Sequence, residues 1–303
     1  MSLTILYRGP LESCNYACEY CPFAKRVEGR EALDRDRAAL SRFVAWVDER
    51  RDEPVAILFT PWGEALVRRW YQEALARLSN LPHVEKAAIQ TNLSCGLSWI
   101  DRCATRSLAL WATFHPGEVA RERFVERCLE ADRRGARLSV GIVGLREHLG
   151  EMEALRRELP AHLYLWVNAY KRVEGYYSEE EIARIEAVDP LFRLNNTRHP
   201  SLGRSCAAGR TVISVAGDGN AQRCHFIKEP IGNIYEAGWE RALQDRACTN
   251  ATCGCHIGYV HLDYLDLGAV FGSGILERIP ALRIWPGGAG APPSLAAHSA
   301  TVT

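Results

Sequence analysis

Short runs of apolar, often β-branched residues alternate along the first part of the chain with longer stretches in which apolar positions recur every three or four residues. The short runs predict strands at residues 3–7, 55–60, 84–91, 108–113, 138–143 and 163–168. The longer stretches predict helices at 34–49, 64–78, 98–105, 119–134, 147–158 and 178–187. Strands that alternate with helices form right-handed βαβ units and a parallel sheet. Six such units are fewer than the eight of a closed TIM barrel, so we expect an α/β fold, a partial (β/α)6 TIM-like barrel open on one side.

The pattern changes after residue 190. Residues 209–224 have the pattern of two strands joined by an Asp218-Gly219 turn, which is a strong hairpin signal. Residues 259–266 alternate polar and apolar positions, which indicates an edge strand or a lid over the active site. His261, Asp263 and Asp266 there are either solvated surface residues or groups for proton transfer or substrate contact. From Pro286 onward Gly, Ala, Pro and Ser dominate, which predicts a disordered tail. We therefore expect a barrel over 1–190, a small cysteine-rich α+β extension over 191–285 and a tail over 286–303.

Composition and charge exclude several classes of protein. The 303 residues are 47% hydrophobic and 24% charged, as in a soluble globular protein. Lys+Arg and Asp+Glu number 37 each, so no charge excess points to nucleic acid or to a membrane surface. No apolar run approaches the ~20 residues of a membrane span, and the N-terminus lacks a secretion signal. Eleven cysteines in such a chain indicate metal binding in a reducing cytoplasm.

Three of these cysteines, Cys14, Cys18 and Cys21, lie in one loop directly after the first predicted strand. Soft thiolate sulfur selects iron-sulfur clusters, zinc or copper(I). A [4Fe-4S] cluster normally takes four cysteines, so three alone would leave one iron open for a cofactor or substrate. A structural zinc site would need partner residues that the next seventy positions lack, and disulfides suit small secreted domains. The spacing therefore favours an incomplete cluster over zinc or a disulfide.

Other polar residues follow the later strands. In parallel sheets, ligands gather at the C-terminal ends of the strands. Gly63 and Glu64 follow the second predicted strand, and Asn92 follows the third. A glycine lets the backbone approach a ligand closely, and a carboxylate can accept hydrogen bonds from an ammonium group. Taken alone, the Gly-Glu pair is equally typical of the start of a helix.

Together these residues resemble the motifs of the radical S-adenosylmethionine (SAM) enzymes. The cysteine loop matches the family's C-x3-C-x-aromatic-C motif, with Tyr20 in the aromatic position. Gly63 and Glu64 match the end of the Gly-Gly-Glu motif that binds the amino group of SAM, and Trp62 replaces its first glycine. The resemblance covers about residues 3 to 190 and includes Asn92 among the expected SAM contacts.

Two further groups of residues extend the resemblance. Ile142, Gly144 and Glu147 match the family's I-x-G-x-x-E segment, which lies beside the adenine. Thr113 and His115 follow the fourth predicted strand, where a ribose contact is often found. The resemblance implies that SAM binds the open iron and that an electron from the cluster cleaves it to a 5'-deoxyadenosyl radical, which takes hydrogen from a substrate. It also implies an electron donor such as flavodoxin or ferredoxin.

Five more cysteines cluster in the C-terminal region: Cys206, Cys224, Cys248, Cys253 and Cys255. The predicted hairpin brings the first two close together, and the later ones can complete a four-ligand site. This segment resembles the SPASM and twitch extensions of radical SAM enzymes, which carry auxiliary clusters. We expect one auxiliary [4Fe-4S] cluster held by Cys206, Cys224 and Cys248 with either Cys253 or Cys255. Structural zinc, with His256 nearby, is the alternative.

The substrate, a peptide or a small molecule, does not follow from the sequence. Two rival functions remain open at this point. One is a non-catalytic iron-sulfur or zinc protein with an electron-transfer or structural role. The other is an enzyme that uses SAM as a methyl donor without a radical. We expect no nucleic-acid partner and no membrane partner, and the sequence assigns no catalytic residue.

Overall fold

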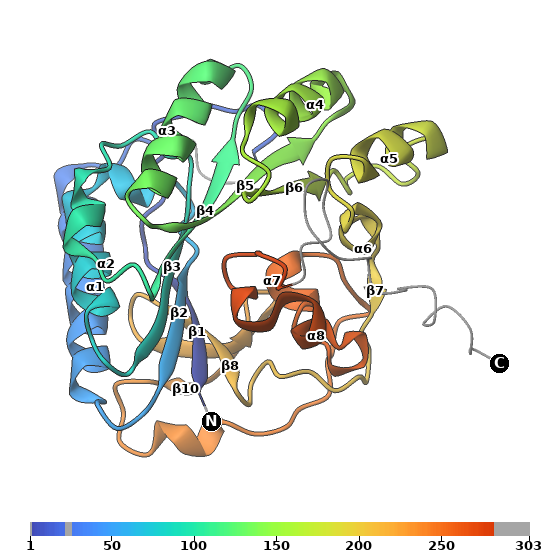
Figure 1. The fold of residues 1–303 in the computed structure, drawn as a ribbon. Helices are drawn as coiled ribbons and strands as arrows, with labels where there is room; N and C mark the ends of the chain where they lie inside the picture. The colour runs from blue at the N-terminus through green and yellow to red at the C-terminus, as the bar shows by residue number, and fades with distance from the viewer. Residues whose placement is uncertain (1, 22–25, 282–303) are drawn as a thin grey trace.

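A nine-stranded sheet forms the frame of the protein, whose computed structural model describes residues 2–21 and 26–281. The order of the strands is β10-β9-β8-β1-β2-β3-β4-β5-β6, as Figure 1 shows. The six strands expected from the sequence are β1 (Leu3–Arg8), β2 (Val55–Phe59), β3 (Val84–Thr91), β4 (Leu108–Phe114), β5 (Arg137–Gly144) and β6 (Tyr164–Ala169). They pair in parallel in chain order, and β6 and β10 do not pair with each other. The predicted partial barrel, open on one side, is confirmed.

Helices cover the outer face of this sheet (Figure 1). They are α1 (Arg30–Glu49), α2 (Arg69–Ser79), α3 (Arg121–Arg133), α4 (Leu149–Glu158), α5 (Glu179–Glu186) and α6 (Phe192–Asn196). The single helix predicted over 64–78 is split into a 3-10 turn, η1 (Ala65–Val67), and α2, because Arg68 between them has an extended backbone. The helix predicted over 98–105 is the five-residue 3-10 helix η2 (Ser98–Arg102). A further 3-10 turn, η3 (Arg146–His148), precedes α4.

The segment after residue 190 continues the same sheet. β8 (Val212–Ala216) pairs in parallel with β1, and β9 (Asn220–Cys224) and β10 (Ile227–Asn233) follow antiparallel. The predicted hairpin between β8 and β9 is confirmed, and Gly219 in its turn has a φ of 90°, which glycine adopts readily. A two-stranded ladder of β7 (His199–Pro200) and β11 (Thr252–Cys253) lies apart from the main sheet.

Part of the concave face of the sheet is covered by the last described part of the chain. Leu6, Leu58, Trp111 and Trp166 form one apolar cluster with residues of that segment. The helical turns of this segment are α7 (His256–Tyr259), η5 (Asp263–Leu265), α8 (Leu267–Phe271) and η6 (Gly272–Gly274), and Figure 1 shows α7 and α8 on the side of the sheet away from α1 and α2. The turn η4 (Trp239–Ala242) lies elsewhere, with Trp239 against Trp46 of α1. The edge strand considered for 259–266 is therefore wrong, because these residues form helical turns, while Asp263 and Asp266 are solvent-exposed as expected. His261 is buried there because the segment packs into the concave face.

A buried ion pair fastens this segment to the sheet. Glu277 is fully buried, and its Oε1 lies 2.5 Å from Lys86 Nζ of β3 and 2.9 Å from Arg137 Nε of β5. Burial lowers the pKa of Lys86, and the charge of Glu277 opposes that shift.

No helix in the described part of the chain is long and apolar enough to cross a membrane. The tail predicted over 286–303 lies outside the described residues.

Candidate functional site

The loop that carries Cys14, Cys18 and Cys21 leaves β1 and lies against the turn after β2. The backbone N–H of Glu64 donates to the carbonyl oxygen of Ser13 at 3.2 Å. A Cβ added at Gly63 would lie only 1.8 Å from that same oxygen. Gly63 is therefore the residue that allows the two backbones to touch.

The ends of β3 and β4 hold the same loop. Asn92 Nδ2 donates to Asn15 Oδ1 at 3.1 Å, and Asn15 Nδ2 donates to Ser94 Oγ at 3.0 Å. On the other side, Glu118 accepts from the backbone N–H of Ala17 at 3.0 Å. Residues from three successive strand ends thus fix the position of one loop, as expected where the C-terminal edges of parallel strands meet.

His115 also contacts the loop directly. Its Nδ1 lies 3.3 Å from Cys18 Sγ and 3.0 Å from Tyr20 Oη, and its ring stacks on the Tyr20 ring. Burial lowers the pKa of His115 to about 4, so the ring is neutral at neutral pH. The sequence predicts a ribose contact for this histidine, whereas the structure shows it against the cysteine loop. The predicted ribose contact of Thr113, a half-buried residue of β4, remains a prediction.

The charge of Cys21 acts on the other two thiols of the loop. Burial is the main cause that raises the pKa of Cys14 and, to about 11, that of Cys18. The nearby Cys21 raises both pKa values further, so the three sulfur atoms share one small region. A metal ligand must be deprotonated, and a bound cation would compensate for the cost of gathering three thiolates. The donor chemistry fits a thiolate-bound cluster.

Glu64 is buried at 3% exposure and braces the ends of β2 and β3. Its Oε1 accepts from the backbone N–H of Leu66 at 2.9 Å and from Thr91 Oγ1 at 2.8 Å. Its Oε2 accepts from the backbone N–H of Asn92. Burial raises the pKa of Glu64 to about 7, and these hydrogen bonds partly offset the shift. The carboxyl group therefore holds the shape of the turn, and its predicted contact with the SAM amino group remains a prediction.

The end of β5 is closed by a tyrosine that the sequence does not point to. Tyr177 Oη donates to the carbonyl oxygen of Gly144 and accepts from the backbone N–H of Tyr170 at 2.7 Å. Ile142 is buried in β5, and Glu147 is exposed in η3. The predicted adenine-side segment therefore lies at the same edge of the sheet as the cysteine loop.

Four of the five C-terminal cysteines line one pocket: Cys206, Cys224, Cys248 and Cys253. Burial is the main cause that raises the pKa of Cys253 to about 12, and the charges of Cys255, Cys224, Cys206 and Cys248 raise it further. His261 lines the same pocket, and its Nε2 is buried without a hydrogen-bond partner among the described residues. An unsatisfied buried N–H or nitrogen lone pair is costly. Four thiols and one orphaned polar atom fit a sulfur-rich metal centre.

Cys255 does not line that pocket. Its thiol lies instead where Lys171, Arg278 and Arg8 act on it electrostatically. The sequence leaves Cys253 and Cys255 as equal candidates for the fourth auxiliary ligand. In the structure Cys253 lines the pocket with the other three, whereas Cys255 lies outside the pocket lining but close enough to raise the pKa of Cys253.

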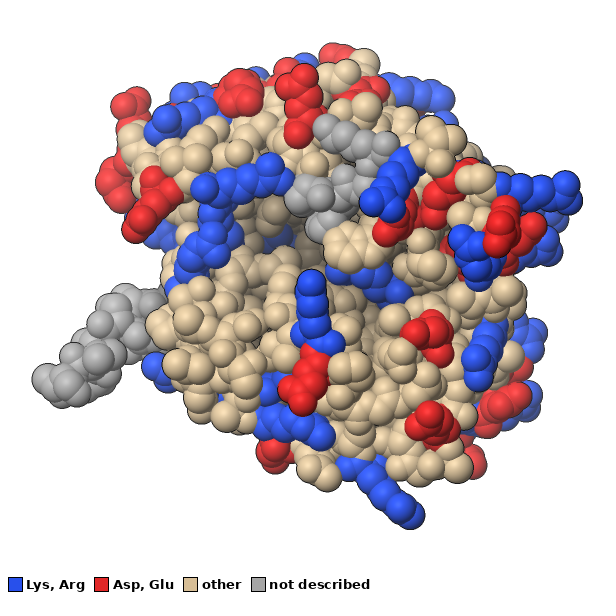
Figure 2. Space-filling model, turned by 180° about the vertical axis from the view of Figure 1, so that it is seen from behind, with Lys and Arg blue, Asp and Glu red and all other residues tan. Residues whose placement is uncertain are grey.

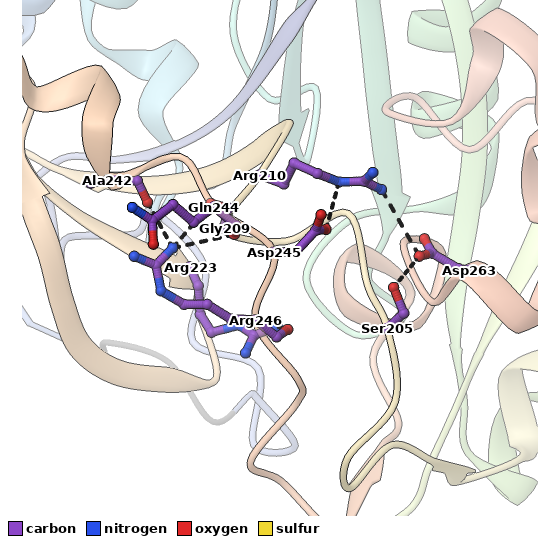
Figure 3. A network of polar contacts seen from close by, with 9 residues as sticks. All are labelled: Ser205, Gly209, Arg210, Arg223, Ala242, Gln244, Asp245, Arg246 and Asp263. Atoms are coloured by element: carbon purple, nitrogen blue, oxygen red, sulfur yellow. Dashed lines mark hydrogen bonds and ion pairs between the residues drawn. The ribbon is translucent and has the colours of Figure 1, made fainter.

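A polar network holds the loop that delivers Cys248 to the pocket (Figure 3). Arg210 pairs with Asp245 at 3.1 Å and approaches Asp263 at 3.9 Å. Arg223 Nη2 donates to the carbonyl oxygen of Arg246 at 2.7 Å. The backbone of Cys248 itself bonds to residues 203 and 204. The position of Cys248 thus depends on contacts from three separate segments of the chain.

Among the described residues, no three His, Cys, Asp or Glu side chains converge so as to hold a single metal ion. A [4Fe-4S] cluster is bound differently, because each cysteine thiolate binds a different iron. The structure has three cysteines in the loop after β1 and four in the pocket beside β9.

Two polar residues that the sequence does not mark, Arg8 and His225, contact Thr60 at the end of β2. Arg8 Nε donates to the carbonyl oxygen of Thr60 at 2.9 Å, and its guanidinium lies 4.0 Å from the centre of the Trp62 ring. His225 Nε2 lies 2.8 Å from Thr60 Oγ1. Burial lowers the pKa of Arg8 to about 10 and that of His225 to about 3. No local motif could have revealed them, because their partners are distant in the sequence.

Comparison with solved structures gives the same fold. The chain superposes on anSMEcpe with bound AdoMet at a TM-score of 0.51 and 12% identity, over 80% of each chain. It superposes on anSMEcpe with bound AdoMet and the Cp18Cys peptide at a TM-score of 0.51 and 11% identity, over 80% of this chain and 82% of the other. No model of a known protein family matches the sequence, and no curated protein matches it either. The chain has the fold of these AdoMet-bound structures, the partial barrel that its motifs predict.

The close contact at Gly63 predicts a local defect in the Gly63→Ala variant. The added Cβ would overlap the Ser13 carbonyl, so the loop must move and the first cysteine group should lose its metal. After anaerobic reconstitution we expect about half of the wild-type iron, because the second group is untouched. Gly96→Ala is the control, since no atom lies within 4 Å of its added Cβ. Full iron content in Gly63→Ala would contradict the assigned role of the contact.

The raised pKa of Glu64 predicts a pH dependence of stability. The carboxyl group of Glu64 keeps its proton up to about pH 7 in the folded protein, but only up to about pH 4.5 in the unfolded chain. The free energy of unfolding therefore falls as the pH rises through that window. The free energy of unfolding of the metal-free protein should fall by about 3 kcal/mol across the window. Urea unfolding at about pH 5 and pH 8 should show this loss in the wild type, and Glu64→Gln should lack it. Equal pH dependence in both proteins would rule out Glu64 as its source.

Proposed function

We propose that the protein is a radical SAM enzyme. Cys14, Cys18 and Cys21 would hold a [4Fe-4S] cluster whose open iron binds SAM, and reductive cleavage of SAM there would supply a 5'-deoxyadenosyl radical. The proposal rests mainly on the loop with three thiols, which hydrogen bonds hold against the ends of β2, β3 and β4. This is the edge of the sheet at which parallel-sheet proteins bind ligands. The fold shared with AdoMet-bound structures supports it.

The residues around the loop suit the binding of SAM. The Gly63-Glu64 turn lies against the loop and can present backbone groups to the amino group of SAM. An ammonium ion placed beside Glu64 would favour its ionised form, because opposite charges lower a carboxyl pKa. Asn92 and Gly144 line the neighbouring strand ends, where they can orient the rest of the cofactor.

We assign the second cysteine group to one auxiliary [4Fe-4S] cluster. Four ligands, Cys206, Cys224, Cys248 and Cys253, would leave no open iron, so this centre would move electrons rather than bind substrate. His261 is neutral, because burial lowers its pKa to about 4, and its orphaned Nε2 can interact with a cluster sulfur.

The substrate would lie between the two cysteine groups. Asn168 is exposed at the C-terminal end of β6 and Arg8 is half-buried at that of β1, so solvent reaches this end of the sheet. A peptide or a small molecule that carries an abstractable hydrogen fits this place, and anSMEcpe itself has been solved with a bound peptide. Flavodoxin or ferredoxin would supply the electron.

SAM cleavage is the direct test of this function. The reconstituted protein, reduced by dithionite with SAM present, should release 5'-deoxyadenosine and methionine. Alanine at Cys14, Cys18 or Cys21 should abolish the release, whereas Cys224→Ala should retain part of it, because it leaves the first group intact. Intact SAM would favour a non-catalytic metal protein, and S-adenosylhomocysteine as the sole product would favour methyl transfer. Either result would overturn the proposal.

The two neighbouring cysteines provide a matched pair of variants for the auxiliary site. Cys253→Ser should lose about half of the iron of the reconstituted protein, because Cys253 lines the four-thiol pocket. Cys255→Ser should keep all of it. Iron, zinc and sulfide analysis of both variants is the measurement. Retained iron in Cys253→Ser together with a loss in Cys255→Ser would reverse the assignment, and zinc in place of iron would change the metal.

A further inference from the structure

The strands of the partial barrel place one layer of side chains above the apolar cluster of the concave face. That cluster includes one inward-facing residue from each of five strands: Leu6, Leu58, Ala88, Trp111 and Trp166. Side chains two positions apart on a strand point to the same face of the sheet. The layer above the cluster therefore consists of Arg8, Thr60, Gln90, Thr113 and Asn168, at the C-terminal ends of β1, β2, β3, β4 and β6. The fifth strand adds Val143, because Gly141 two positions earlier lies against the Trp166 ring.

Solvent reaches this inward layer, and the layer contains a single charge. Asn168 is exposed, and every other member except the buried Thr60 is half-buried. Figure 2 shows a hollow in the face opposite to that of Figure 1, with Lys and Arg side chains at its edge. Arg8 is the one charged residue among the six members of the layer. A substrate that rests on the layer therefore meets neutral side chains and one cation.

Two contacts fix the orientation of the Arg8 guanidinium. Its Nε donates to the carbonyl oxygen of Thr60 at 2.9 Å, and its central carbon lies 4.0 Å from the centre of the Trp62 ring. Thr60 is itself held, because His225 Nε2 lies 2.8 Å from its Oγ1. Within residues 2–21 and 26–281, Nη1 and Nη2 of Arg8 form no hydrogen bond or ion pair. The edge of the guanidinium that carries these two nitrogens is therefore left for a ligand.

Trp62 stands where the family motif has a glycine, and its contact with Arg8 gives this departure a role. A guanidinium stacks well on an aromatic face because it is planar and weakly hydrated. The indole ring thus limits the rotation of the Arg8 side chain before any ligand arrives. A ligand that binds a restrained side chain loses less conformational entropy on binding.

The protein does not neutralise this guanidinium. Burial lowers the pKa of Arg8 to about 10, which means that the site disfavours its charged form. A partly desolvated cation without a counter-ion is costly unless a ligand pairs with it.

We propose that Arg8, oriented by Trp62 and by the Thr60 carbonyl, binds an oxyanion of the substrate through Nη1 and Nη2. The inference deepens the proposed function and rests on it. The substrate carries one carboxylate or phosphate group, and its remaining part lies against the neutral side chains of the inward layer. The two parallel N–H donors of a guanidinium match two oxygens of either anion.

Phenylglyoxal tests whether the two nitrogens are free, because this neutral reagent condenses with the nitrogens of a guanidinium group. Arg156 is the matched control, since it is also half-buried and burial also lowers its pKa. Its Nη1 and Nη2 donate to the carbonyl oxygens of Leu163, Leu159 and Pro160. Mass spectrometry of the reconstituted full-length protein should show a rate at Arg8 on the order of tenfold higher than at Arg156, whose hydrogen bonds must break first.

Added anions then test what Arg8 binds. Inorganic phosphate and acetate are compared with potassium chloride at equal ionic strength, and the exposed Arg172 reports any general effect of the anion on the reagent. The rate at Arg8 should fall along a saturation curve while the rate at Arg172 stays constant. Protection by phosphate indicates a phosphate-bearing substrate, and protection by acetate indicates a carboxylate.

Variants of Trp62 test its part in the site. Trp62→Leu removes the aromatic face and should raise the anion concentration needed for half-protection by up to about fivefold, as expected for one lost cation–π contact. Trp62→Phe keeps an aromatic face and should stay close to the wild type. An unchanged value in Trp62→Leu would overturn the orienting role of the indole ring.

Three other results would overturn the assignment of Arg8. They are a rate at Arg8 as low as that at Arg156, protection by neither anion, and protection by SAM alone in the absence of a reductant. The last result would assign Arg8 to the carboxylate of SAM instead of the substrate. None of these measurements uses SAM cleavage, so failure of the Arg8 site and failure of the proposed enzyme activity are distinguishable.

Discussion

The site depends on one close contact between two backbones. The carbonyl oxygen of Ser13 accepts from the N–H of Glu64 at a point where only a glycine at position 63 leaves enough space. This contact joins the cysteine loop after β1 to the end of β2. The Glu64 carboxylate in turn accepts hydrogen bonds from Thr91 and Asn92 at the end of β3. The loop is thereby placed by the sheet rather than by its own short sequence.

The concave side of the sheet links this loop to the second cysteine group. β8 pairs with β1, so the hairpin that carries Cys224 lies beside the strand that leads into Cys14. The last described segment fills the lower part of the concave face and is fastened there by Glu277. The following residue, Arg278, is buried with its guanidinium over the Trp166 ring of β6. The positions of the two thiol-rich groups thus follow from one sheet arrangement.

The sequence predicts the elements better than it predicts their long-range contacts. Hydrophobic periodicity yields all six parallel strands, and the Asp218-Gly219 turn yields the hairpin, because both signals are local. The contact of His115 with Cys18 joins residues 97 positions apart, and no local pattern encodes it. The choice between Cys253 and Cys255 needs the fold of the pocket, because spacing allows both. The helical turns over 259–266 were missed because burial against the sheet outweighs the alternating pattern.

The electron paramagnetic resonance spectrum of the reduced cluster, recorded with and without SAM, tests the central claim most directly. Cys224→Ala is the suitable background, since it removes a ligand of the auxiliary group and leaves the first group intact. If Cys14, Cys18 and Cys21 leave one iron open for SAM, its addition should change the spectrum of the reduced cluster. A spectrum that is identical with and without SAM would show that no iron at this loop is open to it, and would contradict the account.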